Sequence, residues 1–304
     1  MRIGLSISGL ANTADEARYA EDAGFDFVGC GEHVFFHGPT PNAFVALAVA
    51  AGATSRIRLV TSIALAPVYP SALFAKLAAA LDVVSGGRLD LGVGAGGEYA
   101  SEFEATGVDV TERFRRLEEA LGVLRRLSTG QRVTFEGEFT RLDGVALQPP
   151  PTRQAGPPIW MGGRGEGALR RAGRWADVWM PYLLDPDRVR TGLQKVRDHA
   201  ASAGRDPEAI GAALLAWTAV DHDGEWARTT GLGTVSTTYR QDFSGLADRY
   251  LLLGSPGRVL DRLAEFANAG VEHVLFQVAA SEPDDRRKII ETLAEHVLSA
   301  ARRF

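Results

Sequence analysis

Short apolar runs with a β-like composition alternate with longer, helix-like segments along almost the whole chain. The strands predicted from the short runs cover residues 3–8, 25–30, 58–65, 88–93, 158–161, 177–180, 210–220 and 273–278. The helices predicted between them cover residues 13–23, 41–54, 71–84, 111–128, 166–175, 187–203, 255–269 and 284–303. This order is typical of parallel strands joined by crossover helices, and eight repeats are the number in a (β/α)8 TIM barrel.

Helix ends and long connections refine this prediction. Ala23-Gly24, Ala203-Gly204 and Ala269-Gly270 are typical of helix C-termini. Residues 131–157 contain VTFEGEFTRL, which predicts a hairpin around Glu136-Gly137, and then the extended, proline-rich LQPPPTRQAGPP. Residues 222–254, rich in Thr and Gly, are expected to form a long lid loop, with disorder as the alternative. We therefore expect one domain, residues 1–304, with insertions after the fourth helix and after the seventh strand.

Composition narrows the class of protein. A chain of 304 residues with 45% hydrophobic content suits one large barrel. Its net charge of -5 comes from 33 basic and 38 acidic side chains without a basic stripe, so no nucleic-acid partner is expected. The N-terminus lacks the apolar stretch of a secretory signal, and no apolar run is long enough to span a membrane, which predicts a cytoplasmic protein. Cys30 is the single cysteine and is expected to be buried and inert. No metal site is predicted.

In a barrel, active sites form where strands end, which draws attention first to Gly31-Glu32-His33 after the second strand. The imidazole of His33 can exchange a proton or donate a hydrogen bond at neutral pH. The alternative is a loop histidine bonded to the backbone. Glu32 could pair with an arginine or act as a second acid or base, and the alternative is a solvated carboxylate. His37 is expected to be a loop side chain.

The end of the fourth strand is rich in glycine, and Gly92, Gly94, Gly96 and Gly97 would let the backbone approach a flat ring closely. A tight turn is the alternative, and the run does not match a dinucleotide-binding fingerprint. The sequence WMGGRGEG, residues 160–167, passes from a strand into a helix. Free N–H groups at a helix start favour an anion, and Arg164 can add a bidentate contact. A purely steric need for glycine is the alternative there.

Together these motifs resemble the bacterial luciferase-like monooxygenase superfamily. The segments that carry the resemblance are AEDAGFDFVGCGEHV, SRIRLVTSIALAPVYPSALFAKLAAALDVVSGGRLDLGVGAGGEYASEFEATG, ERFRRLEEALGVLRRL, VTFEGEFTRL, QPPP and PPIWMGGRGEGALRRAGRWADVW. They cover roughly residues 1–180, and the last third matches mainly through SPGRVLDRLAEFANAGVEHVLFQV. The resemblance implies a (β/α)8 barrel with a flavin-like ring across the strand ends, a phosphate at residues 162–165, and a non-prolyl cis peptide near Ser62-Ile63 that supports the ring.

Within this superfamily, the Gly-Glu-His ending of the second strand and the GVGAGGE turn resemble members that use the deazaflavin coenzyme F420 more than members that use FMN. Glu98 follows the glycine turn, where some sugar-phosphate dehydrogenases of that branch carry a catalytic carboxylate, but its placement depends on a one-residue gap. Glu102 resembles the helix-start acid common to many members. The implied catalytic residues are His33 and Glu98, and the implied cofactor-binding residues are Glu32, Ser62, Ile63, Gly94, Gly96, Gly97, Met161, Gly162, Gly163, Arg164 and Gly165.

The function that we predict is hydride transfer between coenzyme F420 and a small organic substrate, with His33 nearest the reacting centre and Trp217 and Tyr239 as candidate walls. One alternative is a monooxygenase that uses reduced FMN supplied by a separate reductase. A second alternative is a flavin-binding barrel without catalytic activity. A homodimer is expected because AFVALAVAAGA and SALFAKLAAALDVV present small side chains, although burial against the barrel would favour alanine equally.

Overall fold

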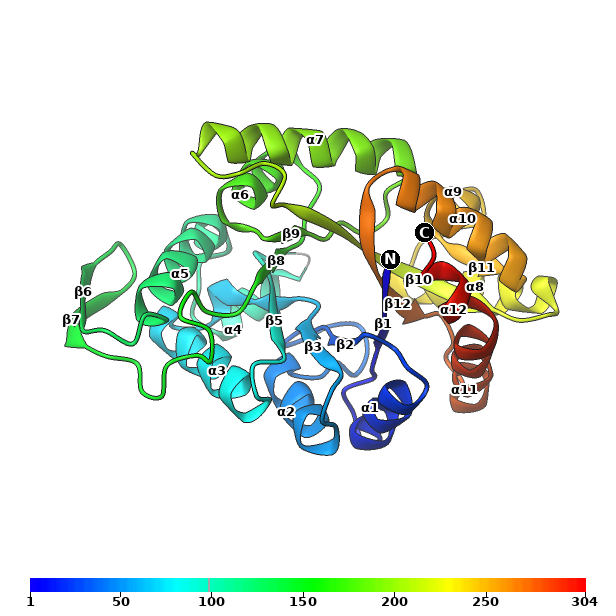
Figure 1. Ribbon diagram of the computed structural model, residues 1–304, viewed down its shortest axis with the longest axis horizontal. Helices are drawn as coiled ribbons and strands as arrows, with labels where there is room; N and C mark the ends of the chain where they lie inside the picture. The colour runs from blue at the N-terminus through cyan, green and yellow to red at the C-terminus, as the bar shows by residue number, and fades with distance from the viewer. Residues whose placement is uncertain (98) are drawn as a thin grey trace. The chain divides into compact units, whose positions relative to one another are not determined.

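The computed structural model describes residues 1–97 and 99–304, so the predicted catalytic residue Glu98 lies outside the described residues. The chain forms two compact units. We call residues 7–19 and 29–162 the N-terminal unit, and residues 1–6, 20–28 and 163–304 the C-terminal unit. Figure 1 shows the elements of both in chain order.

The sheet of the N-terminal unit is parallel and its strands are buried. Strand β5 (Leu89–Gly94) pairs with β3 (Arg58–Thr61), with the short β4 (Ala64–Leu65) and with β8 (Ile159–Met161). Strand β2 (Phe27–Cys30) is divided between the units. Continuous apolar runs are expected for strands covered on both faces. The helices are α1 (Thr13–Asp22, divided between the units), α2 (Ala43–Ala53), α3 (Ser71–Val84), α4 (Ala100–Ala105) and α5 (Arg113–Leu127).

The C-terminal unit continues the same strand and helix alternation. Its long strand β10 (Gly211–Val220) pairs in parallel with β9 (Val178–Trp179), β11 (Leu252–Gly254) and β12 (Val271–Val278). Strand β12 in turn pairs with β1 (Arg2–Ser6). The helices are α6 (Glu166–Trp175), α7 (Pro186–Ser202), α8 (Gly224–Tyr239), α9 (Ala247–Tyr250), α10 (Pro256–Asn268), α11 (Pro283–Thr292) and α12 (Leu298–Ala301), the last two joined by the π-helical turn Leu293–Val297.

Each predicted strand is present and begins and ends within two residues of its expected position. The third is interrupted at Ser62-Ile63, between β3 and β4. The three expected helix ends are confirmed, since Gly24, Gly204 and Gly270 all have positive φ. The predicted cysteine environment is also confirmed: Cys30 is buried, and burial raises the pKa of its thiol to about 12.

The expectation of a long loop over residues 222–254 is wrong, because this segment contains α8, α9 and β11. The glycines and β-branched threonines of α8 have low helix propensity, so the sequence pattern did not predict a helix here. Gly231 has a packing reason, since a Cβ there would lie 2.4 Å from Leu253 Cδ2, whereas Gly233 has open space around it. Asp223 caps the helix by accepting a hydrogen bond from the backbone N–H of Trp226.

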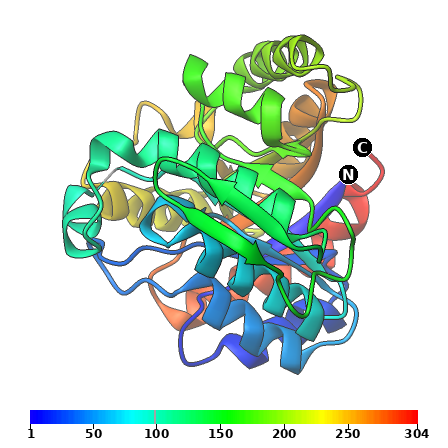
Figure 2. The same cartoon turned by 90° about the vertical axis from the view of Figure 1, so that its left-hand side faces the viewer.

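The predicted hairpin is formed by β6 (Val133–Glu136) and β7 (Arg141–Val145), and Figure 2 shows it lying against helices of the N-terminal unit. Glu119 of α5 accepts hydrogen bonds from the backbone N–H groups of Glu138 and Phe139 in its turn. Thr140 donates to Ser71 of α3 over 2.9 Å. These hydrogen bonds attach the hairpin to helices α5 and α3.

The half-buried His273 on β12 generates a prediction about acid stability. Burial, together with the charges of Arg2 and the N-terminus, lowers the pKa of His273 from 6.5 to about 4. Between those two pH values the unfolded chain binds a proton that the folded chain does not. The contribution of neutral His273 to the free energy of unfolding is therefore complete above pH 6.5. It is lost as the pH falls toward 4, by up to about 1.4 kcal/mol per pH unit.

His273→Gln should flatten the dependence of the free energy of unfolding on pH in this window, as measured by urea unfolding at several pH values. His37→Gln, at an exposed loop position, is the control and should keep the original slope. A His273→Gln protein with an unchanged slope would assign the acid sensitivity to other groups.

Candidate functional site

The clearest chemical constellation of the N-terminal unit surrounds His33, in the loop between β2 and α2. Its Nδ1 lies 2.9 Å from Oε1 of Glu102, a fully buried residue of α4. The other oxygen of Glu102 accepts the backbone N–H of Val34 at 2.7 Å. A carboxylate in its ionised form can only accept, in which case Nδ1 is the donor, and Nε2 is the ring nitrogen that Glu102 does not contact. The ring also stacks on Phe36, with centroids 4.3 Å apart. The imidazole is thus oriented by a carboxylate and by an aromatic face.

Glu32, beside it in the chain, is 6% exposed and has a different surrounding. Its carboxylate accepts hydrogen bonds from the N–H groups of Leu65 (2.8 Å) and Ala43 (3.2 Å) and from the side chains of Asn42 and Tyr69 (3.0 Å each). Burial raises the pKa of Glu32, and the two backbone hydrogen bonds oppose that rise. Burial also raises the pKa of Tyr69. The carboxylate therefore joins the end of β2 to β4 and to the start of α2.

The peptide bond between Ser62 and Ile63 is cis, at the position that the resemblance implied. The N–H of Ser62 donates to the carbonyl of Cys30 at 2.8 Å. The Ser62 hydroxyl oxygen is buried and has no hydrogen-bond partner among residues 1–97 and 99–304. A buried polar atom of this kind is where an external partner would be expected.

The glycines of β5 are needed by the protein's own packing. A Cβ at Gly94 would lie 1.9 Å from Ile63 Cδ1, and one at Gly92 would lie 1.8 Å from the Thr61 carbonyl oxygen. Gly96 and Gly97, by contrast, have φ of 61° and 107°, as a tight turn requires. Arg113 of α5 lies against this turn, since a Cβ at Gly97 would be 2.8 Å from its Nε. Sequence reasoning did not select Arg113.

The turn before α6 belongs to the C-terminal unit from Gly163 onward. Gly163 has φ of 102°, and Gly165 stands at the helix N-cap, where no side-chain cap is present within the described part of the chain. Side chains cap α7, α8 and α10 of the same unit. Arg164 is held by the carbonyl of Leu183 at 3.1 Å and lies over the ring of Tyr182. The start of α6 therefore keeps backbone donors and a fixed guanidinium together.

Three other predicted positions, Met161, Trp217 and Tyr239, lie in buried or aromatic surroundings. Met161 is buried in β8, directly before Gly162. Trp217 of β10 donates from Nε1 to the hydroxyl of Tyr239 at 3.2 Å, so the two candidate walls contact each other. The ring of Phe243 lies 5.6 Å from that of Tyr239 and extends the aromatic group.

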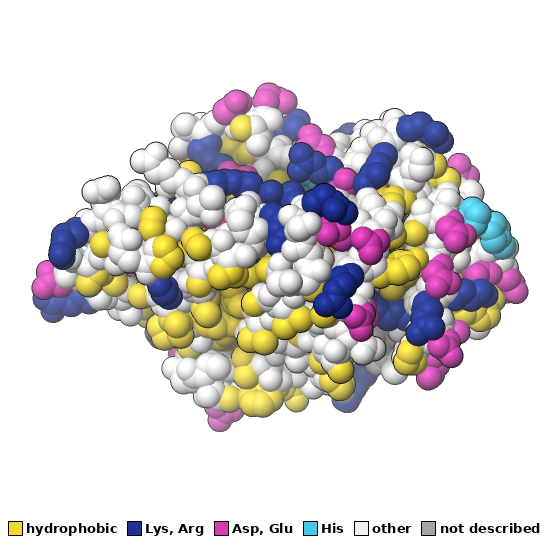
Figure 3. All heavy atoms as spheres, turned by 60° about the horizontal axis from the view of Figure 1, so that its bottom comes forward, with side chains coloured by type: hydrophobic (Ala, Val, Ile, Leu, Met, Phe, Trp, Pro, Cys, Tyr) yellow, Lys and Arg dark blue, Asp and Glu magenta, His cyan; other side chains and the backbone are white. Residues whose placement is uncertain are grey.

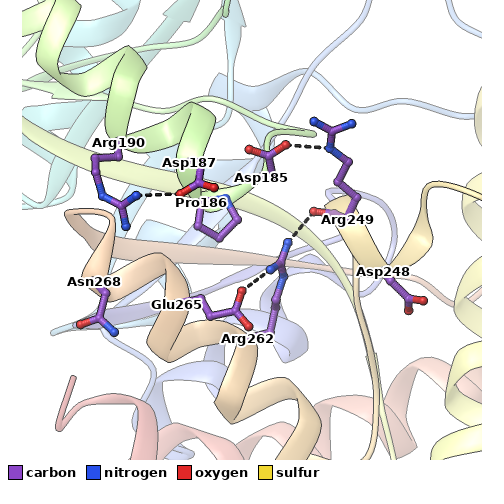
Figure 4. A pocket seen from close by; sticks show the side chains of 9 residues that line it. All are labelled: Asp185, Pro186, Asp187, Arg190, Asp248, Arg249, Arg262, Glu265 and Asn268. Atoms are coloured by element: carbon purple, nitrogen blue, oxygen red, sulfur yellow. Dashed lines mark hydrogen bonds and ion pairs between the residues drawn. The ribbon is translucent and has the colours of Figure 1, made fainter.

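A separate hollow of about 590 Å³ lies in the C-terminal unit beside the start of α7 (Figure 4). Its charged side chains bind one another: Arg249 pairs with Asp185, Arg190 with Asp187, and Arg262 with Glu265. It contains none of the predicted site residues. We regard it as an ion-paired surface hollow that holds α7, the 246–251 segment and α10 together.

Residues 1–97 and 99–304 hold no group of three or more histidine, cysteine or acidic side chains arranged to bind a metal ion. Across the same residues, every helix is too short or too polar to cross a bilayer.

Comparison with known proteins identifies a family and relatives that match this chain. The family model described as luciferase-like monooxygenase matches residues 3–273. The phthiodiolone/phenolphthiodiolone dimycocerosates ketoreductase of Mycobacterium tuberculosis (strain ATCC 25618 / H37Rv) is 28% identical over 297 residues, which cover 82% of this chain and 76% of the relative.

Solved structures agree over nearly the full length. Monooxygenase RslO1 from Streptomyces bottropensis matches with a TM-score of 0.86 and 25% identity, covering 98% of this chain and 99% of the other. An F420-dependent secondary alcohol dehydrogenase in complex with an F420-acetone adduct matches with a TM-score of 0.84 and 24% identity, covering 99% of each chain. The chain therefore belongs to the luciferase-like monooxygenase family of oxidoreductases and has the (β/α)8 barrel fold that its sequence predicts.

Proposed function

We propose that this protein transfers hydride between coenzyme F420 and a small organic substrate, and that His33 exchanges the accompanying proton. The observation that carries this proposal is the bond between His33 Nδ1 and the fully buried carboxylate of Glu102. A buried carboxylate that fixes the tautomer and the direction of an imidazole is the usual way to prepare a general acid or base. Nε2 then accepts a proton from an alcohol, or donates one to a carbonyl when the ring is protonated.

The residues present fit a phosphate-bearing flavin or deazaflavin. The uncapped start of α6, with Gly163, Arg164 and Gly165, suits the phosphate. The buried hydroxyl of Ser62, which lacks a partner in the described structure, suits a polar edge of the ring beside Ile63. When bound, the ring supplies the hydride chemistry, and the protein orients it.

We assign supporting roles to the remaining predicted cofactor-binding residues, beside the phosphate turn and the Ser62 hydroxyl. Glu32 positions Leu65 and the start of α2, and we assign it to support of the cofactor site through these backbone groups. Gly94 accommodates Ile63, while Gly96 and Gly97 form the turn that precedes Glu98. Met161 and Gly162 lead from β8 into the phosphate turn. A catalytic role for Glu98 stays a prediction.

The second candidate is a monooxygenase that uses reduced FMN from a separate reductase, which the likeness to monooxygenase RslO1 favours. Fluorescence quenching by F420 and by FMN compares the two affinities on the purified protein. In stopped-flow oxidation of bound reduced FMN, an oxygenase accumulates a flavin-peroxide absorbance, whereas a flavin binder without activity does not.

We further propose a homodimer formed through α2 and α3. Apolar side chains are exposed on both helices, including Val45 (66%), Val49 (45%), Leu73 (49%) and Val84 (67%). Figure 3 shows hydrophobic side chains gathered on the face that includes the lower side of Figure 1, where these helices lie. Apolar patches of this kind on a soluble protein mark interaction surfaces.

His33→Ala should lower kcat by about 10²–10⁴ and leave cofactor affinity within a few-fold, because it removes the proton exchange but no ring contact. Single-turnover hydride transfer, cofactor affinity and melting temperature are measured together. Loss confined to affinity would make His33 a ring-support residue, and a lower melting temperature with unchanged turnover would make it structural. His199→Ala on α7 controls for the loss of a histidine as such.

Gly163→Asp should weaken cofactor binding by about a hundredfold or more, since it sets a carboxylate against the bound phosphate. Any side chain at this positive φ is strained, and its Cβ would lie 2.7 Å from the Cβ of Ala168. Gly163→Ala therefore measures the strain alone, and the difference between the two affinities measures the charge. Equal affinities for the two variants would place the phosphate elsewhere.

Sedimentation at micromolar concentration should give a species of twice the 32.6 kDa chain mass. Val45→Asp should dissociate it, because the substitution puts a charge on the exposed face of α2. Val145→Asp, at an exposed position of β7 in the hairpin, is the matched control and should remain dimeric. A wild-type protein that sediments only as a monomer would reject the dimer.

A further inference from the structure

Two histidines of the C-terminal unit meet at its surface although 74 residues separate them in the chain. Nε2 of His222 lies 3.1 Å from Nε2 of His296. His222 lies in the connection between β10 and α8, and His296 belongs to the π-helical turn that joins α11 and α12. Both residues are exposed. Neither is among the residues that we assign to the cofactor or to proton exchange.

The connection that carries His222 is held by its own hydrogen bonds. The N–H of Asp221 donates to the carbonyl of Gly254 at 3.3 Å, and the N–H of Asp223 donates to the Asp221 side chain at 2.8 Å. The Asp221 carboxylate also pairs with Lys288 of α11 at 2.9 Å. His222 therefore lies between two anchored residues, beside the helix that leads to its partner.

The π-helical turn fixes His296 in a similar way. The N–H of Leu298 donates to the carbonyl of Leu293, five residues back, and the side chains of Leu293 and Val297 are fully buried. A π-helical turn inside a helix changes the direction of the side chains in it, and such turns are frequent at functional sites. Here the turn carries the imidazole of His296 to that of His222.

The separation of the two imidazole nitrogens matches two ligands of one metal ion. Histidine nitrogens bind zinc at about 2.0–2.1 Å, so two of them at an angle of about 100° lie about 3.1 Å apart. The ring centroids are 4.5 Å apart and the ring planes are inclined by 72°, so the rings meet at an angle and not head-on. Two rings that meet in this way can present both Nε2 atoms to one ion.

The charges around the pair favour a cation. Oε2 of Glu295 lies 3.6 Å from Nε2 of His296. The ammonium group of Lys288 is neutralised by Asp221 and lies 3.8 Å from the centre of the Trp226 ring. A cation at the two nitrogens would therefore have a carboxylate beside it, and the nearby ammonium group is already paired.

We propose that His222 and His296 form a binding site for a divalent transition-metal ion that prefers imidazole, such as Zn²⁺, Ni²⁺ or Cu²⁺. Before binding, one Nε2 carries the proton shared by the pair. That proton moves to Nδ1 of the same ring, and both Nε2 lone pairs bind the ion. Water completes the coordination, so the site is weaker than a structural zinc site with four protein ligands. Mg²⁺ and Ca²⁺, which prefer oxygen ligands, do not bind there.

Isothermal titration of the full-length protein, without an affinity tag, with zinc chloride tests the site. His222→Gln and His296→Gln should each lower the affinity for zinc by at least about tenfold. The double variant should lose little more, because either substitution already removes the two-point attachment. His199→Gln, on α7 of the same unit, is the control and should keep the affinity. A wild-type protein that binds no zinc, or losses that simply add, would overturn the proposal and leave the pair as a hydrogen bond.

Electron paramagnetic resonance with an equimolar amount of Cu²⁺ counts the ligands directly. The wild-type spectrum should show coupling to two imidazole nitrogens, and each single variant should show coupling to one. A wild-type spectrum with a single coupled nitrogen would assign the copper to a different histidine and overturn the paired site.

The ion should also stabilise the fold, because it joins the end of β10 to the C-terminal helices. Zinc at about ten times its dissociation constant should raise the melting temperature by about 2–4 °C, and EDTA should reverse the rise. An equal rise in His222→Gln at the same zinc concentration would show that the stabilising ion binds elsewhere and would contradict the proposal.

Discussion

Two buried carboxylates determine how the strand ends of the N-terminal unit are arranged. Glu32 takes the backbone N–H groups of Leu65 and Ala43, and Glu102 takes the N–H of Val34 and the ring of His33. A buried carboxylate without donors costs several kcal/mol, so each must keep its partners in the folded state. The loop between β2 and α2 is therefore fixed at two points. The orientation of His33 is a consequence of this constraint, because its neighbour Val34 and its own ring bind the same carboxylate.

Around the cis peptide bond Ser62-Ile63, the same residues serve the packing against β5 and the proposed cofactor site. Ile63 fills the space above Gly94, and the Thr61 carbonyl lies where a Cβ of Gly92 would be. The glycines of β5 thus permit the close approach of another segment of the same unit, in which the Ser62 hydroxyl oxygen is buried. The sequence suggested either a ring or a tight turn for all four glycines. Gly96 and Gly97 have the positive φ of a tight turn, and Gly92 and Gly94 are required by protein packing, while a contact of these glycines with a ring stays a prediction.

The repeating strands and helices could be predicted because their periodicity is local, and the positions of glycine at helix ends follow from local backbone geometry. Helix α8 could not, since its threonines and glycines have low propensity and its stability comes from packing on β10 and β11. The partnership of His33 with Glu102 spans 69 residues, and a single sequence holds no signal for such a pairing. The sequence predicts Glu102 as a helix-start acid, and it does lie in the first turn of α4. Its contact with His33 depends on the fold, which brings the loop after β2 and helix α4 together.

Charged side chains are distributed unevenly between the segments that follow the strands. Arg164 and the uncapped start of α6, which we propose bind the cofactor phosphate, come from the segment that follows β8. The loops that follow β1, β2, β4 and β5 carry acids and apolar side chains instead. In the function proposed above, an anionic cofactor phosphate and a proton-exchanging histidine make opposite demands on the local field, since cations near His33 would disfavour its protonated form. Under the proposed function, Arg164 and the backbone donors before α6 would hold the phosphate, and the acid-rich loops that follow β2 and β5 would favour protonated His33.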